Sequence, residues 1–267
     1  MKAEFIYSPH YDFSMYGIEK LHPFDAKKYS RAWELFTRSA SNITTTIVDT
    51  PCDDAFLLSG HTASYLEALN DSAMVAKVIE IGLAKFLPNR TLQSKLITPA
   101  KYACQGTWLA TQKAIQESKI AMNVGGGYHH AFTDHGEGFC FFADAALAII
   151  NARKQGLLAA DDEVLMIDLD AHRGNGFESF FREDRAVKNF DMYNFQTYPG
   201  MHEGDVDDYP FMVPLRAGMQ GPEYLKALQE EITPFLKSAQ SPKLAFYNAG
   251  TDILHGDTLG GLNVSFD

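Results

Sequence analysis

Three short segments of this sequence combine glycine with acidic residues or histidine directly after an apolar run. Apolar runs of this length, separated by helical patterns, predict buried parallel strands. In an open parallel sheet, ligands bind beyond the carboxyl ends of the strands, so we expect the three segments to meet at one edge of a sheet. The segments are residues 125–130 (GGGYHH) after 120–124, 168–172 (DLDAH) after 164–167, and 248–252 (NAGTD) after 244–247.

The second segment has the spacing of a metal site. Side chains alternate along an extended strand, so Asp168, Asp170 and His172 project to one side. Two carboxylates and an imidazole on one face repel and desolvate each other unless a cation compensates them. Asp252 adds an oxygen ligand from another strand, and two aspartates with one histidine leave an open position, as in catalytic zinc sites. The alternative is a solvated loop of helix-capping aspartates, with Asp252 in a turn.

The tandem His129 and His130 could transfer protons. Neutral imidazoles beside an activated water can accept its proton and return it to a leaving group. Glycines 125–127 would let the backbone approach a substrate closely. A phosphate-binding loop is a weaker interpretation, because no Gly-Lys-Ser/Thr follows the glycines. The alternative is that the two histidines are an ordinary loop feature.

The elements that must position these segments are predicted from apolar spacing and end signals. We expect strands at 4–7, 120–124, 164–169, 187–193 and 244–248. We expect helices after Asp25 (with Tyr29, Trp33 and Phe36 on one face), after an N-cap at Thr98 followed by Pro99, over 71–87 up to Pro88, over 143–155 up to Gly156, and over 222–237, which Pro234 should bend or end. Strands alternating with helices predict an α/β fold with a parallel sheet, and the lack of a linker predicts one domain over residues 1–267.

Composition excludes several classes of protein. The chain has 267 residues, 23 Lys and Arg against 34 Asp and Glu, and a net charge of −11, which argues against a nucleic-acid backbone as a direct partner. It contains no apolar run long enough to span a membrane and none near residue 1 that resembles a signal peptide. Its 3 cysteines leave one unpaired in any disulfide scheme. We therefore expect an intracellular, cytoplasmic protein.

Taken in chain order, the motifs resemble the zinc-dependent histone deacetylase family of the arginase/deacetylase fold. The resemblance rests on residues 125–131, 168–176, 248–252 and 257–262, and residues 17–25, 191–194 and 198–200 are similar to its class IV branch. It implies a single α/β domain whose parallel sheet has helices on both faces. It also implies hydrolysis of an acyl group from the lysine side chain of a protein or peptide substrate.

The resemblance assigns roles residue by residue. It implies zinc ligands at Asp170, His172 and Asp252, proton transfer by His129 and His130, a carboxylate partner for His129 at Asp168, and acyl-lysine contacts at Gly138, Phe139, Tyr198 and Leu259. It also implies K⁺ bound by main-chain oxygens around residues 168–172, with help from Asp191. Asn175 stands where many relatives have a second carboxylate, so His130 should favour its neutral form.

One family element is missing from the sequence. The family places a Gly-Gly-Tyr motif beyond residue 262, and its tyrosine donates a hydrogen bond to the developing oxyanion. The sequence stops at Asp267 without it, so we expect a C-terminally incomplete domain. Loss of one such donor typically lowers turnover by about 10²- to 10³-fold.

Three other functions stay open. One is an acyl-lysine or metal-binding module without catalysis, and another is an acetylpolyamine amidohydrolase with the same motifs. A ureohydrolase with two manganese ions is disfavoured, because Arg173 and Asn175 stand where further carboxylate ligands are wanted. The sequence does not predict an oligomeric state.

Overall fold

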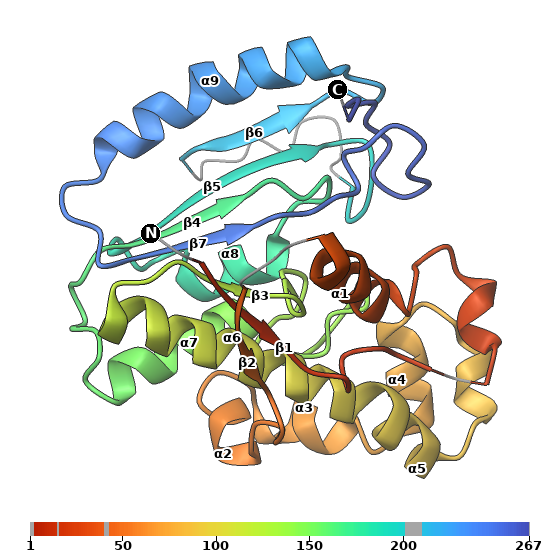
Figure 1. Cartoon of the computed structure of the whole chain (residues 1–267). Helices are drawn as coiled ribbons and strands as arrows, with labels where there is room; N and C mark the ends of the chain where they lie inside the picture. Colours follow the sequence, from red (N-terminus) through yellow and green to blue (C-terminus); the bar gives the residue numbers. More distant parts are fainter. Residues whose placement is uncertain (1–2, 15, 40–42, 201–209, 267) are drawn as a thin grey trace. The chain divides into compact units, whose positions relative to one another are not determined.

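The computed structural model describes residues 3–14, 16–39, 43–200 and 210–266 of the chain (Figure 1). Met1–Ala159 and Ala160–Asp267 form two compact units, and each is described by itself. In both units parallel strands are connected through helices, which confirms the predicted α/β class. The expectation of one domain over residues 1–267 stays a prediction.

The described strands of the first unit form a parallel sheet in the order β2-β1-β3. Its strands are β1 (Glu4–Tyr7), β2 (Thr44–Ile47) and β3 (Ala121–Asn123), with Glu4 opposite both Thr44 and Ala121. Its helical segments are η1 (Ile18–Leu21), α1 (Lys28–Ser39), α2 (Asp54–Leu57), α3 (Ala63–Ala68), α4 (Ser72–Val78), η2 (Gly82–Phe86), α5 (Asn89–Leu92), η3 (Gln93–Ile97), α6 (Thr98–Glu117) and α7 (Asp144–Lys154).

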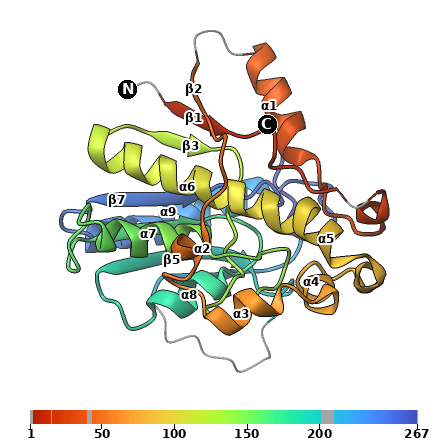
Figure 2. The same cartoon turned by 90° about the horizontal axis from the view of Figure 1, so that it is seen from below.

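Alternation along β1 places a helix on each face of this sheet. The rings of Phe5 and Tyr7 point to one face, where Phe5 meets Phe36 at 4.2 Å and Tyr7 stacks on Trp33 at 4.6 Å, both on α1. Glu4 points to the other face and forms an ion pair with Lys113 of α6 at 2.9 Å. Figure 2 shows α6 running along the sheet, and α6 also packs against α7.

The described strands of the second unit form a parallel sheet in the order β6-β5-β4-β7. They are β4 (Val164–Asp168), β5 (Val187–Asn194), β6 (Met212–Leu215) and β7 (Leu244–Asn248). Helices α9 (Gly221–Ser238) and α8 (Asn175–Phe181) lie on opposite faces of it (Figures 1 and 2).

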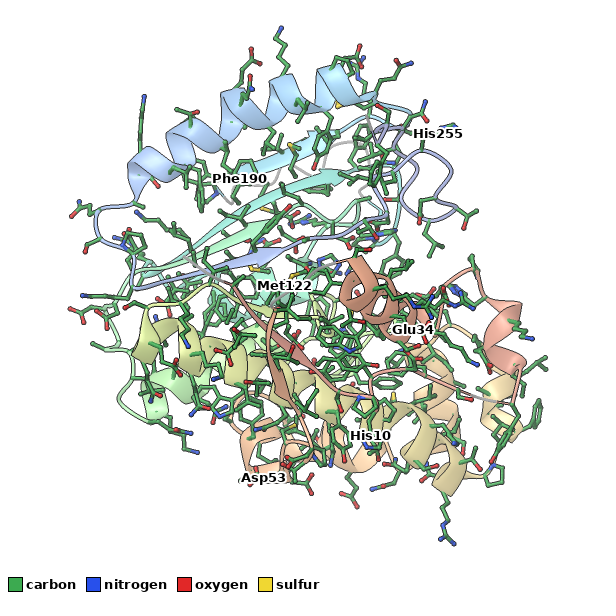
Figure 3. All side chains as sticks on the ribbon, viewed as in Figure 1. His10, Glu34, Asp53, Met122, Phe190 and His255 are labelled. Carbon is green, nitrogen blue, oxygen red and sulfur yellow. The ribbon has the colours of Figure 1, made fainter. Side chains whose placement is uncertain are left out.

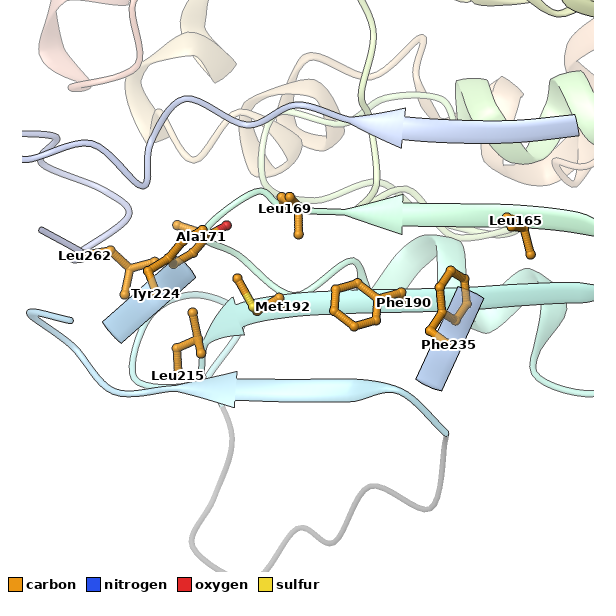
Figure 4. Close-up of a cluster of buried hydrophobic side chains, with 9 residues drawn as sticks. All are labelled: Leu165, Leu169, Ala171, Phe190, Met192, Leu215, Tyr224, Phe235 and Leu262. Atoms are coloured by element: carbon orange, nitrogen blue, oxygen red, sulfur yellow. The ribbon is translucent and has the colours of Figure 1, made fainter. Parts of the chain in front are cut away.

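The apolar core of the second unit lies between its sheet and α9. Phe190 of β5 points toward α9 and meets Phe235 with ring centroids 5.4 Å apart (Figures 3 and 4). Ala171 and Leu262, which follow β4 and β7, belong to the same buried cluster. Apolar packing therefore extends beneath the loops that carry Asp170 and Asp252.

The structure corrects three sequence predictions. The helix predicted over 71–87 is interrupted between α4 and η2, where Glu80 has a φ of 57°. Thr98 is not an N-cap, because the backbone is already helical through η3 at Ile97. Of the two outcomes expected at Pro234, a bend or an end of the helix, the end is wrong, because α9 continues to Ser238. Strands β2 and β6 were not predicted from the sequence.

Candidate active site

Strands β4 and β7 bring two of the three predicted segments together. They are neighbours in parallel register, and Asp168 at the end of β4 lies opposite Asn248 at the end of β7. The buried Asp168 carboxylate accepts hydrogen bonds through Oδ1 from Asn248 Nδ2 at 3.0 Å and from the Asp170 N–H at 3.1 Å. It therefore fixes the point at which both loops leave the sheet.

The two loops place three potential metal ligands around one point. One ligand atom from each of Asp170, His172 and Asp252 lies within 4.8 Å of the others. His172 Nδ1 is 3.0 Å from Asp170 Oδ1 and 2.8 Å from Asp252 Oδ2. The remaining oxygen of Asp252 accepts the Ala171 N–H at 2.9 Å, which ties the β7 loop to the β4 loop.

Gly250 makes this close approach possible. A Cβ at this position would lie 2.4 Å from Asp170 Cα and 2.5 Å from Asp170 Oδ2. Because real Cβ atoms do not approach other atoms this closely, a side chain would push the two loops apart. The glycine of the third motif thus has a packing role beside the metal ligands.

The electrostatics of this cluster favour a cation. Burial by itself would lower the pKa of His172, but its hydrogen bonds to Asp170 and Asp252 and their negative charges raise that pKa to about 10. Burial raises the pKa of Asp252, and the Asp170 carboxylate acts in the same direction, against the hydrogen bond from His172. Two carboxylates and one imidazole are donors that zinc accepts, so the residues present fit the predicted ion.

The histidine pair lies on a loop of the first unit. His129 and His130 are buried, with ring centroids 4.1 Å apart and an interplanar angle of 54°. The backbone just before them is held by Asp144, the first residue of α7. The action of the pair together with the ligands of the second unit stays a prediction.

The predicted acyl-lysine contacts fall in both units. In the first, Gly138 and Phe139 both have positive φ, 53° and 64°, and the Phe139 ring stacks on Phe24 at 4.6 Å and contacts His22 at 4.6 Å. In the second, Tyr198 and Leu259 are half-buried. The assignment of these residues to a substrate tunnel stays a prediction.

Asn175 and Asp191 belong to α8 and β5, the two elements that follow the loop carrying Asp170 and His172. Asn175 begins α8, and Asp191 is buried and accepts the Gly174 N–H at 2.7 Å. The neighbouring Arg173 forms an ion pair with the buried Glu178. The predicted potassium site involves this same region and stays a prediction.

Sequence reasoning did not assign the roles of two acidic residues that organise the loops, Asp257, which belongs to the third motif, and Asp144. Asp257 accepts the N–H groups of Leu259 and Gly260, at 2.8 and 3.0 Å, and forms the turn after the metal loop. Asp144 accepts the N–H groups of Gly127 and Tyr128 and so holds the histidine loop. The role of Asp257 could have been found from its turn-forming position before Gly260 and Gly261, whereas the place of Asp144 at the start of a helix suggests only a capping role.

Comparison with known proteins identifies the family. Residues 22–267 match the family described as histone deacetylase domain. The chain therefore belongs to the histone deacetylase family, a family of deacetylase hydrolases. The assignment to a class IV branch stays a prediction.

Individual relatives agree with this assignment. The chain is 39% identical over 269 residues to histone deacetylase 2 of Arabidopsis thaliana, covering 100% of this chain and 67% of that protein. It is 29% identical over 225 residues to histone deacetylase 8 of Xenopus laevis, covering 77% and 65%. The chain thus matches about two thirds of the length of these relatives.

A solved structure shows the same fold. The crystal structure of the HDA15 HD domain is similar with a TM-score of 0.74 and 19% sequence identity, covering 99% of this chain and 78% of that one.

None of the helices described for this chain combines the length and the apolar character that crossing a membrane requires.

Proposed function

We propose that this chain is a zinc-dependent hydrolase that removes acetyl or longer acyl groups from lysine side chains of proteins or peptides. The observation that carries the proposal is the cluster of Asp170, His172 and Asp252, whose ligand atoms lie within 4.8 Å of one another at the ends of two neighbouring strands. Membership of the histone deacetylase family supports the reaction class.

Asp170, His172 and Asp252 would hold the zinc ion and leave a coordination position open. When bound, zinc would polarise the acyl carbonyl and lower the pKa of water. Asp168 keeps the ligand loops in register by accepting hydrogen bonds from Asn248 and from the Asp170 N–H. Potassium, held by main-chain oxygens around residues 168–172 and by Asp191, would support the same loop.

His129 and His130 would move the protons of the reaction. One of them takes a proton from the attacking water, and the pair later protonates the departing lysine amine. Asp168 is the proposed carboxylate partner of His129. Asn175 is the proposed amide partner of His130, and an amide there leaves that imidazole neutral and able to act as a base.

The proposed substrate is an acyl-lysine, which is uncharged before cleavage. Phe139 and Tyr198 would contact its aliphatic stem, Leu259 the base of the pocket, and the Gly138 backbone its amide. The net charge of −11 favours lysine-rich polypeptides as substrates. The odd number of cysteines, 3, favours a reducing, intracellular location.

The proposal is tested by incubating the zinc-loaded protein with an acetyl-lysine peptide and with an acetylated polyamine, and measuring acetate release. The reaction is run with this chain and with a version extended through the family's Gly-Gly-Tyr motif. We expect acetate release from the peptide. We expect the His130→Ala variant to lose this activity while its zinc content is unchanged. Equal inactivity of both proteins on the peptide, or hydrolysis of the polyamine alone, would overturn the proposal.

A further inference from the structure

A buried carboxylate of the first unit holds the backbone that leads into the histidine pair. Asp144 is 2% exposed and lies in the first turn of α7. Its Oδ1 accepts the Tyr128 N–H at 2.8 Å, and its Oδ2 accepts the Gly127 N–H at 3.1 Å. Both oxygens of one side chain thus fix two consecutive peptide groups immediately before His129.

The carboxylate is itself held by a chain of buried polar groups. The Thr107 hydroxyl donates to Asp144 Oδ2 at 2.6 Å and accepts from Asn123 Nδ2 at 3.0 Å. Asn123 Oδ1 accepts the Tyr11 hydroxyl at 2.8 Å and the Gly125 N–H at 3.3 Å. The glycine loop therefore donates to side chains at the end of β3 and the start of α7, and Thr107 of α6 joins those two side chains, so the network favours one backbone path.

Residue 126 of the loop lies directly against Asp144 and Thr107. A Cβ at residue 126 would lie 2.2 Å from Asp144 Oδ2 and 2.7 Å from Thr107 Oγ1, and Gly126 has a φ of +88°. Glycine is required there both by the backbone conformation and by the closeness of the carboxylate. Residues 126–128 of the loop therefore all contact the Asp144 carboxylate.

We propose that Asp144 is a positioning residue for the proton-transferring pair His129 and His130. It acts through the Gly127 and Tyr128 peptide groups, not by contact with substrate. Donors from Thr107, Gly127 and Tyr128 reach both oxygens of the side chain, and only a carboxylate accepts at both ends. An asparagine would direct an NH₂ group at one of these donors. This inference rests on the proposed function of the histidine pair.

Removing this carboxylate from water costs free energy, which the hydrogen bonds around it must offset. Desolvation raises the pKa of Asp144, while the hydrogen bonds from Thr107, Tyr128 and Gly127 act against that shift. The N-terminus of α7 also favours a negative charge. Hydrogen bonds from N–H groups to a carboxylate are stronger than those between neutral groups, so a carboxylate here would hold the loop more firmly than an amide.

The test compares Asp144→Asn with Asn151→Ala, a control in the same helix. Asn151 is also buried, and its amide donates to Ser59 Oγ at 2.6 Å and to the Leu147 carbonyl at 2.8 Å, away from the histidine loop. Thr107→Ser keeps the hydroxyl and serves as the conservative variant. Folded fraction and zinc content are measured for each variant before comparison.

The first readout is amide hydrogen exchange, which needs no activity. Asp144→Asn should speed exchange of the Gly127 and Tyr128 amides by about 10- to 100-fold relative to the rest of the unit. Asn151→Ala and Thr107→Ser should leave these two amides unchanged. Unchanged exchange in Asp144→Asn would overturn the inference, even if the wild-type chain has no turnover.

The second readout separates positioning from general destabilisation. In the active protein, Asp144→Asn should lower kcat by about 100-fold with KM within about 3-fold, because the histidines are misplaced while substrate binding persists. An equal loss of kcat in Asn151→Ala at equal folded fraction would contradict a positioning role. A zinc-loaded wild-type protein that lacks turnover would contradict only the proposed function.

Discussion

Gly250→Ala should weaken zinc binding without removing any ligand. The backbone of Gly250 has an ordinary φ, so alanine is allowed there by conformation alone. Its added methyl group, however, would meet Asp170 Cα at 2.4 Å and Asp170 Oδ2 at 2.5 Å. The substitution therefore tests whether the packing of the two loops sets the geometry of the metal site.

The size of the effect follows from these distances. Ordinary van der Waals contact for a Cβ begins at 3.4 Å, so the two loops must separate by about 1 Å. Overpacking of this kind costs about 1–3 kcal/mol of folding free energy. Displacement of a ligand by changes just behind it lowers metal affinity by about 10- to 100-fold.

Zinc affinity is measured by competition with a chelator, and stability by thermal unfolding of the metal-free protein. Gly256→Ala is the matched control, because its Cβ would meet no described atom within 4 Å although its φ is +90°. That variant should lose about 1 kcal/mol of stability from backbone strain and keep its zinc affinity. If Gly250→Ala binds zinc as tightly as Gly256→Ala, loop packing does not set the site.

Asp252→Ala should abolish zinc binding, measured as metal content after dialysis, because it removes one ligand and the acceptor of the Ala171 N–H. His130→Ala should keep one zinc per chain and lower turnover by about 10²- to 10⁴-fold; unchanged turnover would refute its role. The hydrogen bond from Thr46 and the ion pair with Lys113 lower the pKa of Glu4 to about 2 from its ordinary 4.5. Glu4 therefore stabilises the fold above about pH 4.5, and this is lost as the pH falls toward 2, so Glu4→Gln should cost about 1–2 kcal/mol at pH 7 and little at pH 2 in urea unfolding. An equal cost at both pH values would contradict that account.

The strands that carry chemistry were predictable because they are both apolar and followed by polar motifs. β1 and β7 match the predicted ranges, and β4 and β5 differ only at their ends. β2 was missed because its sequence, Thr-Thr-Thr-Ile, has no buried residue, and β6 was missed because it contains Pro214. Both lie at the edge of their sheets, where packing leaves little trace in the sequence.

Helix ends were less predictable, since tertiary contacts override local signals. Buried apolar residues occur on both sides of Glu80, among them Val78, Ile79 and Ile81, so the apolar pattern does not reveal the break there. Pro234 is exposed, so water can satisfy the carbonyl that it leaves without a partner, and α9 continues past it.

The candidate site also contains residues that the sequence predicts and residues whose role depends on tertiary packing. The cluster of Asp170, His172 and Asp252 could be predicted, because strand alternation and parallel neighbours bring these residues together. Asp144 could not, because its bond to Thr107 spans 37 residues and depends on the packing of two helices. Its position at the start of a helix suggests no more than a capping role.

The proposed function requires one zinc ion at Asp170, His172 and Asp252 for the deacylation of lysine. The most direct measurement treats the protein with a chelator and titrates zinc back while acetate release from an acetyl-lysine peptide is followed. We predict that activity rises linearly and stops at one zinc per chain, and that Asp252→Ala does not respond. Activity that survives the chelator, or that returns only with two manganese ions per chain, would contradict the claim.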